Sequence, residues 1–225
     1  MSNRLYFEGG ARHLARLHGT EEDFSICPFF YKVGSCRHTD RCQRSHERPA
    51  FACTVLIPHM WTNPAAEAET NPSYRRSTVQ QENAEFAEFF EDVFAELAKF
   101  GELEDMQVLE NVSEHMKGHL FVKFYDEEDA KKCVEGMRGR FFAGRAISPE
   151  FSSVSDFKEA RCRKFDSQTC DRGLKCNFSH IKLLPRHDEF LLNLLQKQPY
   201  AGERSNQLDR LHRRIPDQRK RRRSR

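Results

Sequence analysis

The chain has 225 residues, of which 38% are hydrophobic and 32% charged, and its formal net charge is +3. This length accommodates one ordinary domain and a few small modules, but not two large cores. No stretch approaches the roughly 18–20 consecutive apolar residues of a membrane helix, so we expect no membrane partner. Residues 1–20 contain no continuous apolar block, which argues against a secretory signal peptide.

The charge is unevenly distributed along the chain. Residues 82–110 contain ten acidic residues and one lysine, whereas residues 201–225 contain ten basic and three acidic residues. The two cysteine-rich segments are also basic. Such a chain can meet a polyanion at some surfaces and a basic partner at another.

Residues 1–24 are expected to form a short helix or tether that leads into a first cysteine-rich group. Its spacing is Cys27-x8-Cys36-x5-Cys42-x3-His46, and a second group near the C-terminus has the spacing Cys162-x7-Cys170-x5-Cys176-x3-His180. Three thiolates and one imidazole complete the tetrahedral shell of a closed structural zinc site. We therefore expect two structural Zn²⁺ ions, neither with an open position for a catalytic water.

Metal is a better interpretation of these cysteines than disulfide pairing. Six of the eight cysteines are grouped tightly with histidines, and no secretory signal is expected. Neither group encloses enough residues for a hydrophobic core, so the metal must supply the folding free energy. Cys53 and Cys133 fall outside both groups and are expected to be ordinary buried thiols.

The segment after the first group begins with residues 51–61, which are rich in strand formers. Residues 62–79 contain Asn63-Pro64 and many small polar residues, so they are expected to form a long loop. A helix over residues 82–99 is predicted by an apolar spacing of three and four residues. The residues that carry this spacing are Phe86, Phe89, Phe90, Val93, Phe94 and Leu97.

Three further strands and a second helix complete a recognisable order. Strands are expected over residues 103–110 and 118–125, separated by a turn, and a last strand over residues 143–151. Asp126 is expected to cap a helix that ends at about residue 137. The order β-α-β-β-α-β is the ferredoxin-like plan of the RNA recognition motif (RRM), so we predict an α+β, RRM-like domain between two Cys-Cys-Cys-His (CCCH) zinc fingers.

A short helix over residues 155–160 leads into the second finger, and residues 186–198 have the pattern of an amphipathic helix. Residues 217–225 form a basic tail that we expect to be disordered. The predicted organisation is a tether (1–24), finger 1 (25–48), the RRM-like domain (49–154), finger 2 (155–184), a C-terminal helix (185–200) and a basic tail (201–225).

Aromatic and basic side chains alternate between the ligands of both fingers. Aromatic rings can stack on unpaired bases while Arg and Lys hold phosphates, so this composition favours single-stranded RNA. The alternative is that the rings shield the metal and the charges are solvated. The first and last strands of this fold are antiparallel neighbours, so the fingers attached to them should meet as one composite surface.

The RRM-like domain itself has a poor RNA platform and a charged helix. Phe121 is expected to be exposed and would suit base stacking, but the comparable exposed position on the first strand is Leu56 rather than an aromatic residue. Four acidic residues of helix 82–99 form a stripe, which indicates either a solvated face or a docking site for a basic peptide. They are Glu85, Glu88, Asp92 and Glu96.

Four segments resemble the small subunits of the spliceosomal U2 auxiliary factor, over roughly residues 19–184. They are 27-CPFFYKVGSCRHTDRCQRSH-46, 117-KGHLFVKFYDEEDAKKC-133, 139-GRFFAGRAI-147 and 160-ARCRKFDSQTCDRGLKCNFSH-180. The resemblance implies a nuclear pre-mRNA splicing factor that is not an enzyme. It implies that the fingers recognise the AG dinucleotide at the intron 3′ splice site. It further implies that the central domain is a U2AF homology motif that forms a heterodimer with the large subunit, which binds the polypyrimidine tract.

The resemblance also implies roles for particular residues. The RNA-contacting candidates are Phe29, Tyr31, Arg37, Gln43 and Arg44 in finger 1, and Arg163, Phe165, Arg172 and Phe178 in finger 2. The candidates for gripping an aromatic, basic peptide of the large subunit are Asp92, Glu96, Arg140, Phe141 and Phe142.

The chain departs from the family pattern at three places. Gln43 stands where the family has a small hydroxyl residue, so the base preference beside AG should differ. Phe141 stands where a Trp is usual, and the tail has only Arg223-Ser224-Arg225 in place of a long Arg-Ser repeat.

One alternative function is a regulatory CCCH protein that binds AU-rich or other single-stranded RNA. The long domain between the fingers argues against it, since paired fingers of that kind are usually joined by a short linker. An RNA-modifying enzyme is disfavoured because the chain has neither a Gly-rich phosphate loop nor a deaminase metal motif. The basic tail, residues 219–225, is expected to direct nuclear import.

Overall fold

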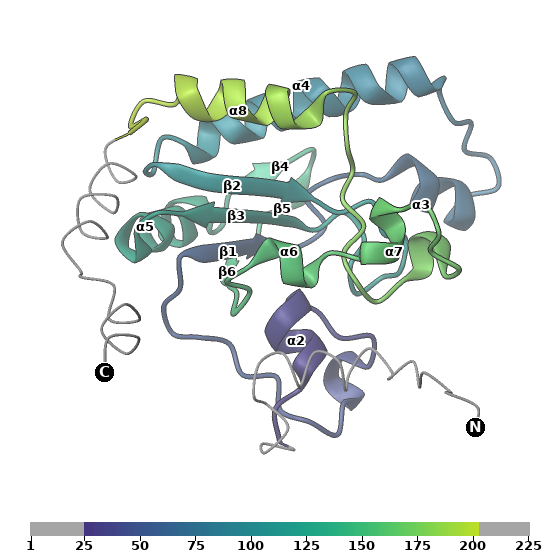
Figure 1. Ribbon diagram of the computed structural model, residues 1–225, viewed down its shortest axis with the longest axis horizontal. Coiled ribbons are helices and arrows are strands. Elements are labelled where there is room, and N and C mark those ends of the chain that lie inside the picture. The colour runs from purple at the N-terminus through teal and green to yellow at the C-terminus, as the bar shows by residue number, and fades with distance from the viewer. Residues whose placement is uncertain (1–24, 203–225) are drawn as a thin grey trace, which may run out of the picture.

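The computed structural model describes residues 25–202 and is built on a four-stranded antiparallel sheet (Figure 1). The strands are β1 (Thr54–Ile57), β2 (Leu103–Val108), β3 (Leu120–Phe124) and β6 (Glu150–Phe151), in the spatial order β2-β3-β1-β6. Helix α4 (Val79–Leu97) connects β1 to β2, and α5 (Glu127–Met137) follows β3. The predicted ferredoxin-like plan is therefore confirmed.

Both long helices begin at side-chain caps that the sequence supplies. Thr78 accepts a hydrogen bond from the backbone N–H of Gln81, whose side chain bonds back to Thr78, and this capping box starts α4 three residues earlier than expected. Asp126 accepts from the backbone N–H of Glu128 and starts α5 as predicted.

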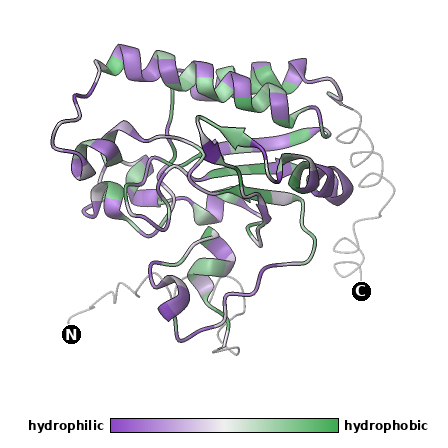
Figure 2. Cartoon of the chain, turned by 180° about the vertical axis from the view of Figure 1, so that it is seen from behind, coloured by the Kyte–Doolittle hydropathy of each residue, from purple (hydrophilic) through white to green (hydrophobic). Residues whose placement is uncertain are grey.

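The apolar faces of α4 and α5 cover one face of the sheet. The strands and α4 carry many hydrophobic residues in Figure 2, and the polar residues of α4 lie on its outer side. The fully buried side chains of this core include Phe86 and Phe90 from α4 and Phe124 from β3. Because Phe86 and Phe90 lie one helical turn apart, they project from α4 on the same side.

The opposite face of the sheet, on which an RRM stacks bases, is covered. Helix α2 (Pro28–Val33) of finger 1 and α6 (Phe157–Ala160) pack against it. Leu56 and Phe121 are only 4% and 3% exposed. The prediction that these two side chains are exposed was therefore wrong. Finger 1 covers this face of the sheet, and an RNA base could reach Phe121 only if finger 1 moved away.

Helix α8 (His187–Lys197) lies alongside α4 and β2 (Figure 1). Just after it, the Gln198 side chain accepts a hydrogen bond from the Leu103 backbone N–H at 2.8 Å and donates to the Leu103 carbonyl at 3.1 Å. The amide thus satisfies the backbone N–H and carbonyl of Leu103 as a neighbouring strand would. This protects the outer edge of β2 from pairing with another chain.

Two secondary-structure expectations were wrong. The predicted loop 62–79 contains helix α3 (Pro64–Thr70). The helix forms because the Asn63 side chain accepts a hydrogen bond from the Ala65 backbone N–H and Pro64 occupies the first helical position. The predicted last strand is divided into β5 (Arg145–Ala146) and β6, and β5 forms a hairpin with β4 (Phe141–Phe142). The hairpin forms because its two turn residues, Ala143 and Gly144, both have positive φ, as a type I′ turn requires.

The two fingers contain only short helical turns. Finger 1 has the 3₁₀ turn η1 (Thr39–Arg41) after α2, and finger 2 has α7 (Arg163–Asp166) and η2 (Gly173–Lys175). The predicted tether, 1–24, and the basic tail segment 217–225 lie outside the described residues. Within residues 25–202, no helix is both long enough and apolar enough to cross a membrane.

Candidate metal centres and nucleic-acid interface

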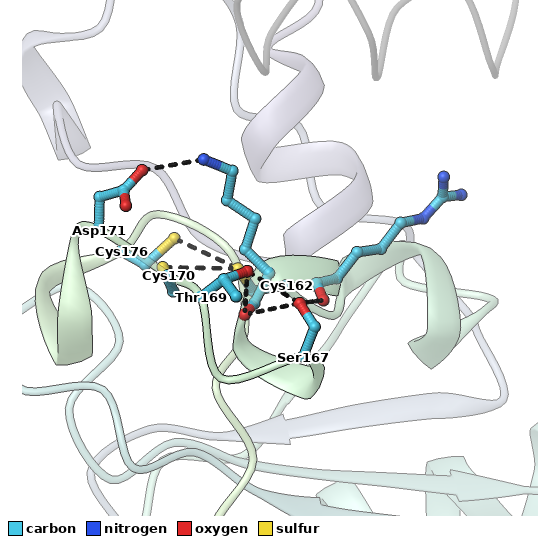
Figure 3. A network of polar contacts seen from close by, with 8 residues as sticks. Cys162, Ser167, Thr169, Cys170, Asp171 and Cys176 are labelled. Atoms are coloured by element: carbon cyan, nitrogen blue, oxygen red, sulfur yellow. Dashed lines mark hydrogen bonds and ion pairs between the residues drawn. The ribbon is translucent and has the colours of Figure 1, made fainter.

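Each predicted ligand set converges on one point. In both sets the four ligand atoms lie within 4.8 Å of one another. The Sγ atoms of Cys36 and Cys42 are 3.9 Å apart, and Cys162 lies 3.8 Å from both Cys170 and Cys176 (Figure 3). A tetrahedron with Zn–S bonds of about 2.3 Å has an edge of about 3.8 Å, so both centres fit zinc.

The protonation chemistry of the ligands also fits a metal centre. Burial, with a further contribution from neighbouring thiols, raises the pKa of the Cys36 and Cys162 thiols to about 12, so thiolates need a cation beside them. Burial lowers the pKa of His46 and His180, which keeps both imidazoles neutral, as ligation requires. The buried Nε2 atoms of both histidines have no hydrogen-bond partner among the described residues.

An aromatic ring stacks on each ligating imidazole. Phe30 lies 4.5 Å from His46 with an interplanar angle of 6°, and Phe165 lies 4.1 Å from His180 at 19°. The two phenylalanines occupy the same place in the two fingers, three residues after the first cysteine. Phe165 therefore shields a metal ligand with one of its faces, and a base could stack only on the other.

The two fingers repeat one backbone design, which the ligand spacing alone could only suggest. The Cys27 N–H donates to the Ser45 carbonyl at 3.1 Å, and the Cys162 N–H donates to the Ser179 carbonyl at 3.0 Å. In finger 2 the loop between the first two cysteines is held further by an ion pair of 2.9 Å between Lys164 and Asp171 (Figure 3).

Finger 2 is joined to the end of β2 through a buried asparagine. Asn111 is fully buried, and its amide donates to the carbonyls of Cys176 and Phe178 at 3.0 Å each. Its Oδ1 accepts from the backbone N–H of the ligand His180 at 2.8 Å. The Glu110 N–H adds a 2.8 Å bond to the His180 carbonyl. The candidate metal centre is thereby fixed to the RRM-like domain.

Finger 1 is held against the sheet by close packing. Gly34, at φ +78°, ends α2, and a Cβ placed there would lie 2.7 Å from the ring of Phe121. Val33 is fully buried in the same cluster, and the Ser153 hydroxyl donates to the Tyr31 carbonyl at 2.8 Å. Each finger is therefore placed by the same domain.

The fingers meet, as the sheet topology predicts. The rings of Phe29 and Phe178 pack edge to face with centroids 5.6 Å apart. Beside this contact, Arg37 of finger 1 and Arg172 of finger 2 line one cleft of about 430 Å³. The expectation of a composite surface is confirmed in its geometry.

The cleft has four other lining residues, which were not among the predicted RNA contacts. They are Ser113 and His115 from the loop after β2, and Lys175 and Asn177 from finger 2. The loop was expected to be a plain turn, and nothing in the sequence indicates that it reaches the fingers. Asn177 could have been found, because it follows the third cysteine of finger 2 as Gln43 does in finger 1.

The remaining predicted RNA contacts do not line this cleft. Tyr31 is 38% exposed, and Gln43 and Arg163 are also exposed. Arg44 donates a long hydrogen bond of 3.4 Å to the Ile26 carbonyl, so it has a role within finger 1. The RNA contacts of these residues stay predictions.

A somewhat larger cleft, of about 470 Å³, lies between β2, β3, α6 and α8. Its walls carry both signs of charge, including Glu104, Asp105, Lys123 and Arg161. Burial raises the pKa of Asp105, one of its acidic groups. The mixed charge does not favour a polyanion, whereas the three charged residues of the inter-finger cleft are all basic.

The predicted partner-binding residues gather at the end of α4 and the β4–β5 hairpin. Arg140 forms a 2.7 Å ion pair with Glu96, and Lys99 together with this guanidinium holds the pKa of that carboxyl below its usual value. Phe142 packs on Phe89 of α4 at 5.7 Å between centroids. Phe141 is 71% exposed, so it points outward as expected.

Comparison with known proteins places this architecture in a family. The RNA recognition motif family matches residues 91–148. The splicing factor U2AF 23 kDa subunit of Schizosaccharomyces pombe is 41% identical over 172 residues, which cover 76% of this chain and 78% of that protein. The chain belongs to the family of U2AF small subunits. The U2AF 26 kDa subunit of Rattus norvegicus is 38% identical over 218 residues, which cover 95% of this chain and 96% of that protein.

Some relatives in the U2AF small-subunit family are longer. One of the U2af small subunits of Arabidopsis thaliana is 40% identical over 177 residues, and the match spans 78% of this chain but only 62% of that protein. The shared part is therefore common to plant, yeast and mammalian splicing factors. Membership of the U2AF small-subunit family argues against the alternative that the chain is a regulatory CCCH protein.

Proposed function

We propose that this chain is a nuclear, non-catalytic component of a splicing factor whose two zinc fingers together recognise the AG dinucleotide at the 3′ splice site of introns. The observation that carries the proposal is the cleft between the fingers, to which each contributes an arginine, Arg37 and Arg172. Guanidinium groups bind phosphates and pair with purine edges, so one short RNA segment could engage both fingers.

The proposal includes zinc as a structural ion at both centres. The ligands would be Cys27, Cys36, Cys42 and His46 in finger 1, and Cys162, Cys170, Cys176 and His180 in finger 2. The sulfur–sulfur distances, the stacked imidazoles and the donor set support zinc. Its role is to hold the basic and aromatic side chains of each short finger in fixed positions, since neither finger has a core of its own.

We further propose that α4 and the β4–β5 hairpin bind the large U2AF subunit, which occupies the polypyrimidine tract. Three acidic side chains of α4, Glu85, Glu88 and Asp92, are exposed. Their charge suits a basic peptide, and the exposed ring of Phe141 suits an apolar groove of the partner. The ion pair between Arg140 and Glu96 fixes the hairpin against the helix.

The test of RNA recognition is binding to short RNAs that end in AG, CG or AA, at one fixed salt concentration. The proposal predicts the tightest binding to the RNA that ends in AG. Affinity for the other two RNAs should be lower by about tenfold or more, since a good base contact contributes about 1–3 kcal/mol. Arg37→Ala and Arg172→Ala should both weaken binding. Arg138→Ala, which removes an exposed charge outside the cleft, should not. Equal affinity for all three RNAs would reject 3′ splice-site recognition.

A further inference from the structure

The loop between β2 and β3, residues 109–119, lies under the cleft and is fixed by both fingers. The Ser35 hydroxyl of finger 1 donates a hydrogen bond to the His115 carbonyl. On the other side, the Val112 N–H donates to the Leu174 carbonyl of finger 2 at 3.0 Å. The loop is therefore a rigid floor, and a side chain that it presents to the cleft has a defined position.

Within this loop, His115 has a polar group for which the described part of the fold provides no partner. It lines the cleft, and its buried Nε2 has no hydrogen-bond partner among the described residues. An unpaired buried nitrogen costs about 1–3 kcal/mol, so a fold that keeps one has a reason to do so. Burial, Arg37 and His38 lower the pKa of this imidazole, so the ring is neutral near pH 7.

Two kinds of binding group line the cleft. Arg37, Arg172 and Lys175 are cations suited to phosphates, whereas Ser113, His115 and Asn177 are uncharged donors and acceptors suited to base edges. A neutral imidazole attracts no phosphate, but a ring nitrogen, as an N–H donor or as an acceptor according to the tautomer, can pair with a base edge. The volume of about 430 Å³ lies within the range of about 300–1,000 Å³ of small-ligand sites.

We propose that His115 reads the edge of one unpaired base held between the fingers, as a specificity-determining residue contributed by the RRM-like domain. The inference rests on the proposed function, because it requires RNA in this cleft. It adds a third recognition element to the two fingers. The domain whose own sheet is covered by finger 1 would thus still contribute to base recognition, through a loop instead of through β1 and β3.

The test uses the full chain, His115→Ala, and RNAs that carry each of the four bases in turn at the positions of and flanking AG. One further RNA carries an abasic nucleotide at the position where the variant changes the preference most. Wild type should lose about 5- to 100-fold in affinity on the abasic RNA, the range of one base contact. His115→Ala should bind the intact and the abasic RNA equally.

Two variants separate base recognition from general effects. Lys175→Ala, which removes a cation from the same cleft, should weaken all RNAs alike and reduce the salt dependence. His115→Gln, which keeps a donor and an acceptor, should retain part of the base preference. If His115→Ala loses zinc or fails to fold, the comparison of His115→Gln with wild type provides the test instead.

The outcomes also separate this inference from the proposed function. If neither His115 variant changes the ratio of affinities among the RNAs, the inference is wrong, while wild-type preference for AG would leave the proposed function standing. If wild type itself shows no preference among AG, CG and AA, the proposed function fails first. A uniform loss on all RNAs would also overturn the inference, because it would assign His115 a structural role only.

Discussion

At the scale of single residues, Asn111 joins the candidate metal site of finger 2 to the RRM-like domain. Its three hydrogen bonds satisfy backbone groups of Cys176, Phe178 and His180 in a place that water does not reach. Buried polar groups of this kind cost free energy when they lose their partner. Together with the backbone bonds from Glu110 and Val112 to finger 2, this amide side chain fixes the position of finger 2, and therefore of Arg172.

Asn111→Ala should destabilise finger 2 without affecting finger 1. Three buried backbone groups lose their partners at about 1–3 kcal/mol each, partly relieved by water. Metal analysis of wild type is expected to give two zinc ions per chain. With a chelator, the variant should release one of them much faster than wild type. The control is Asn177→Ala, which removes a nearby amide side chain that is half-buried and lines the cleft. This variant should release both ions at rates close to those of wild type. Unchanged release from Asn111→Ala would contradict this role.

At the scale of elements, the sequence predicted the helices and strands that carry a clear period. Helix α5 and its cap Asp126 agree with expectation, since a cap followed by an apolar stripe is a local signal. Helix α3 was missed because Asn63-Pro64 also fits a turn. The β4–β5 hairpin was missed because positive φ at Ala143 is unusual for a residue with a side chain.

Gly34 provides a test of how finger 1 packs on the sheet. Gly34→Ala places a Cβ 2.7 Å from Phe121 and strains a backbone at φ +78°. Gly139 has the same φ, +78°, with nothing within 4 Å of an added Cβ, so Gly139→Ala measures the backbone strain alone. We expect the Gly34 variant to lose about 1–3 kcal/mol more than the Gly139 variant in denaturant unfolding. Equal losses would mean that finger 1 does not pack closely on Phe121.

In the proposed heterodimer, Phe141 of the β4–β5 hairpin is an anchor for the partner. Phe141→Ala should weaken heterodimer formation by about 1–3 kcal/mol, in the range of a moderate anchor, and leave the Tm unchanged because the ring is 71% exposed. Asp92→Lys should abolish binding of the large partner by reversing a charge of the acidic stripe. Phe51→Ala is the control, since that ring is 59% exposed and lies near Phe151 instead. Full affinity with a lower Tm for Phe141→Ala would make the ring a packing residue.

At the scale of the whole molecule, the two clusters that could hold a metal were predictable from the sequence, and the cleft between the fingers only partly so. The spacing of the cysteines and histidines is a local signal, so the convergence of both sets of four residues could be predicted from the sequence. The meeting of the fingers followed from strand order alone. The position of His115 and Ser113 in this cleft could not be predicted, because it depends on contacts between residues far apart in sequence, such as Ser35 with His115. The burial of Phe121 under finger 1 was hidden for the same reason.

A double-mutant cycle determines whether the two fingers act as one RNA-binding surface, as we propose. Affinity for one AG-ending RNA would be measured for wild type, Arg37→Ala, Arg172→Ala and the double variant. If both arginines hold the same RNA segment, the double variant should lose less than the sum of the single losses, by more than about 0.5 kcal/mol. The pair Arg37 and Arg138 should show no such coupling. Additive losses, or a response from only one finger, would mean that the two fingers do not form one RNA-binding surface.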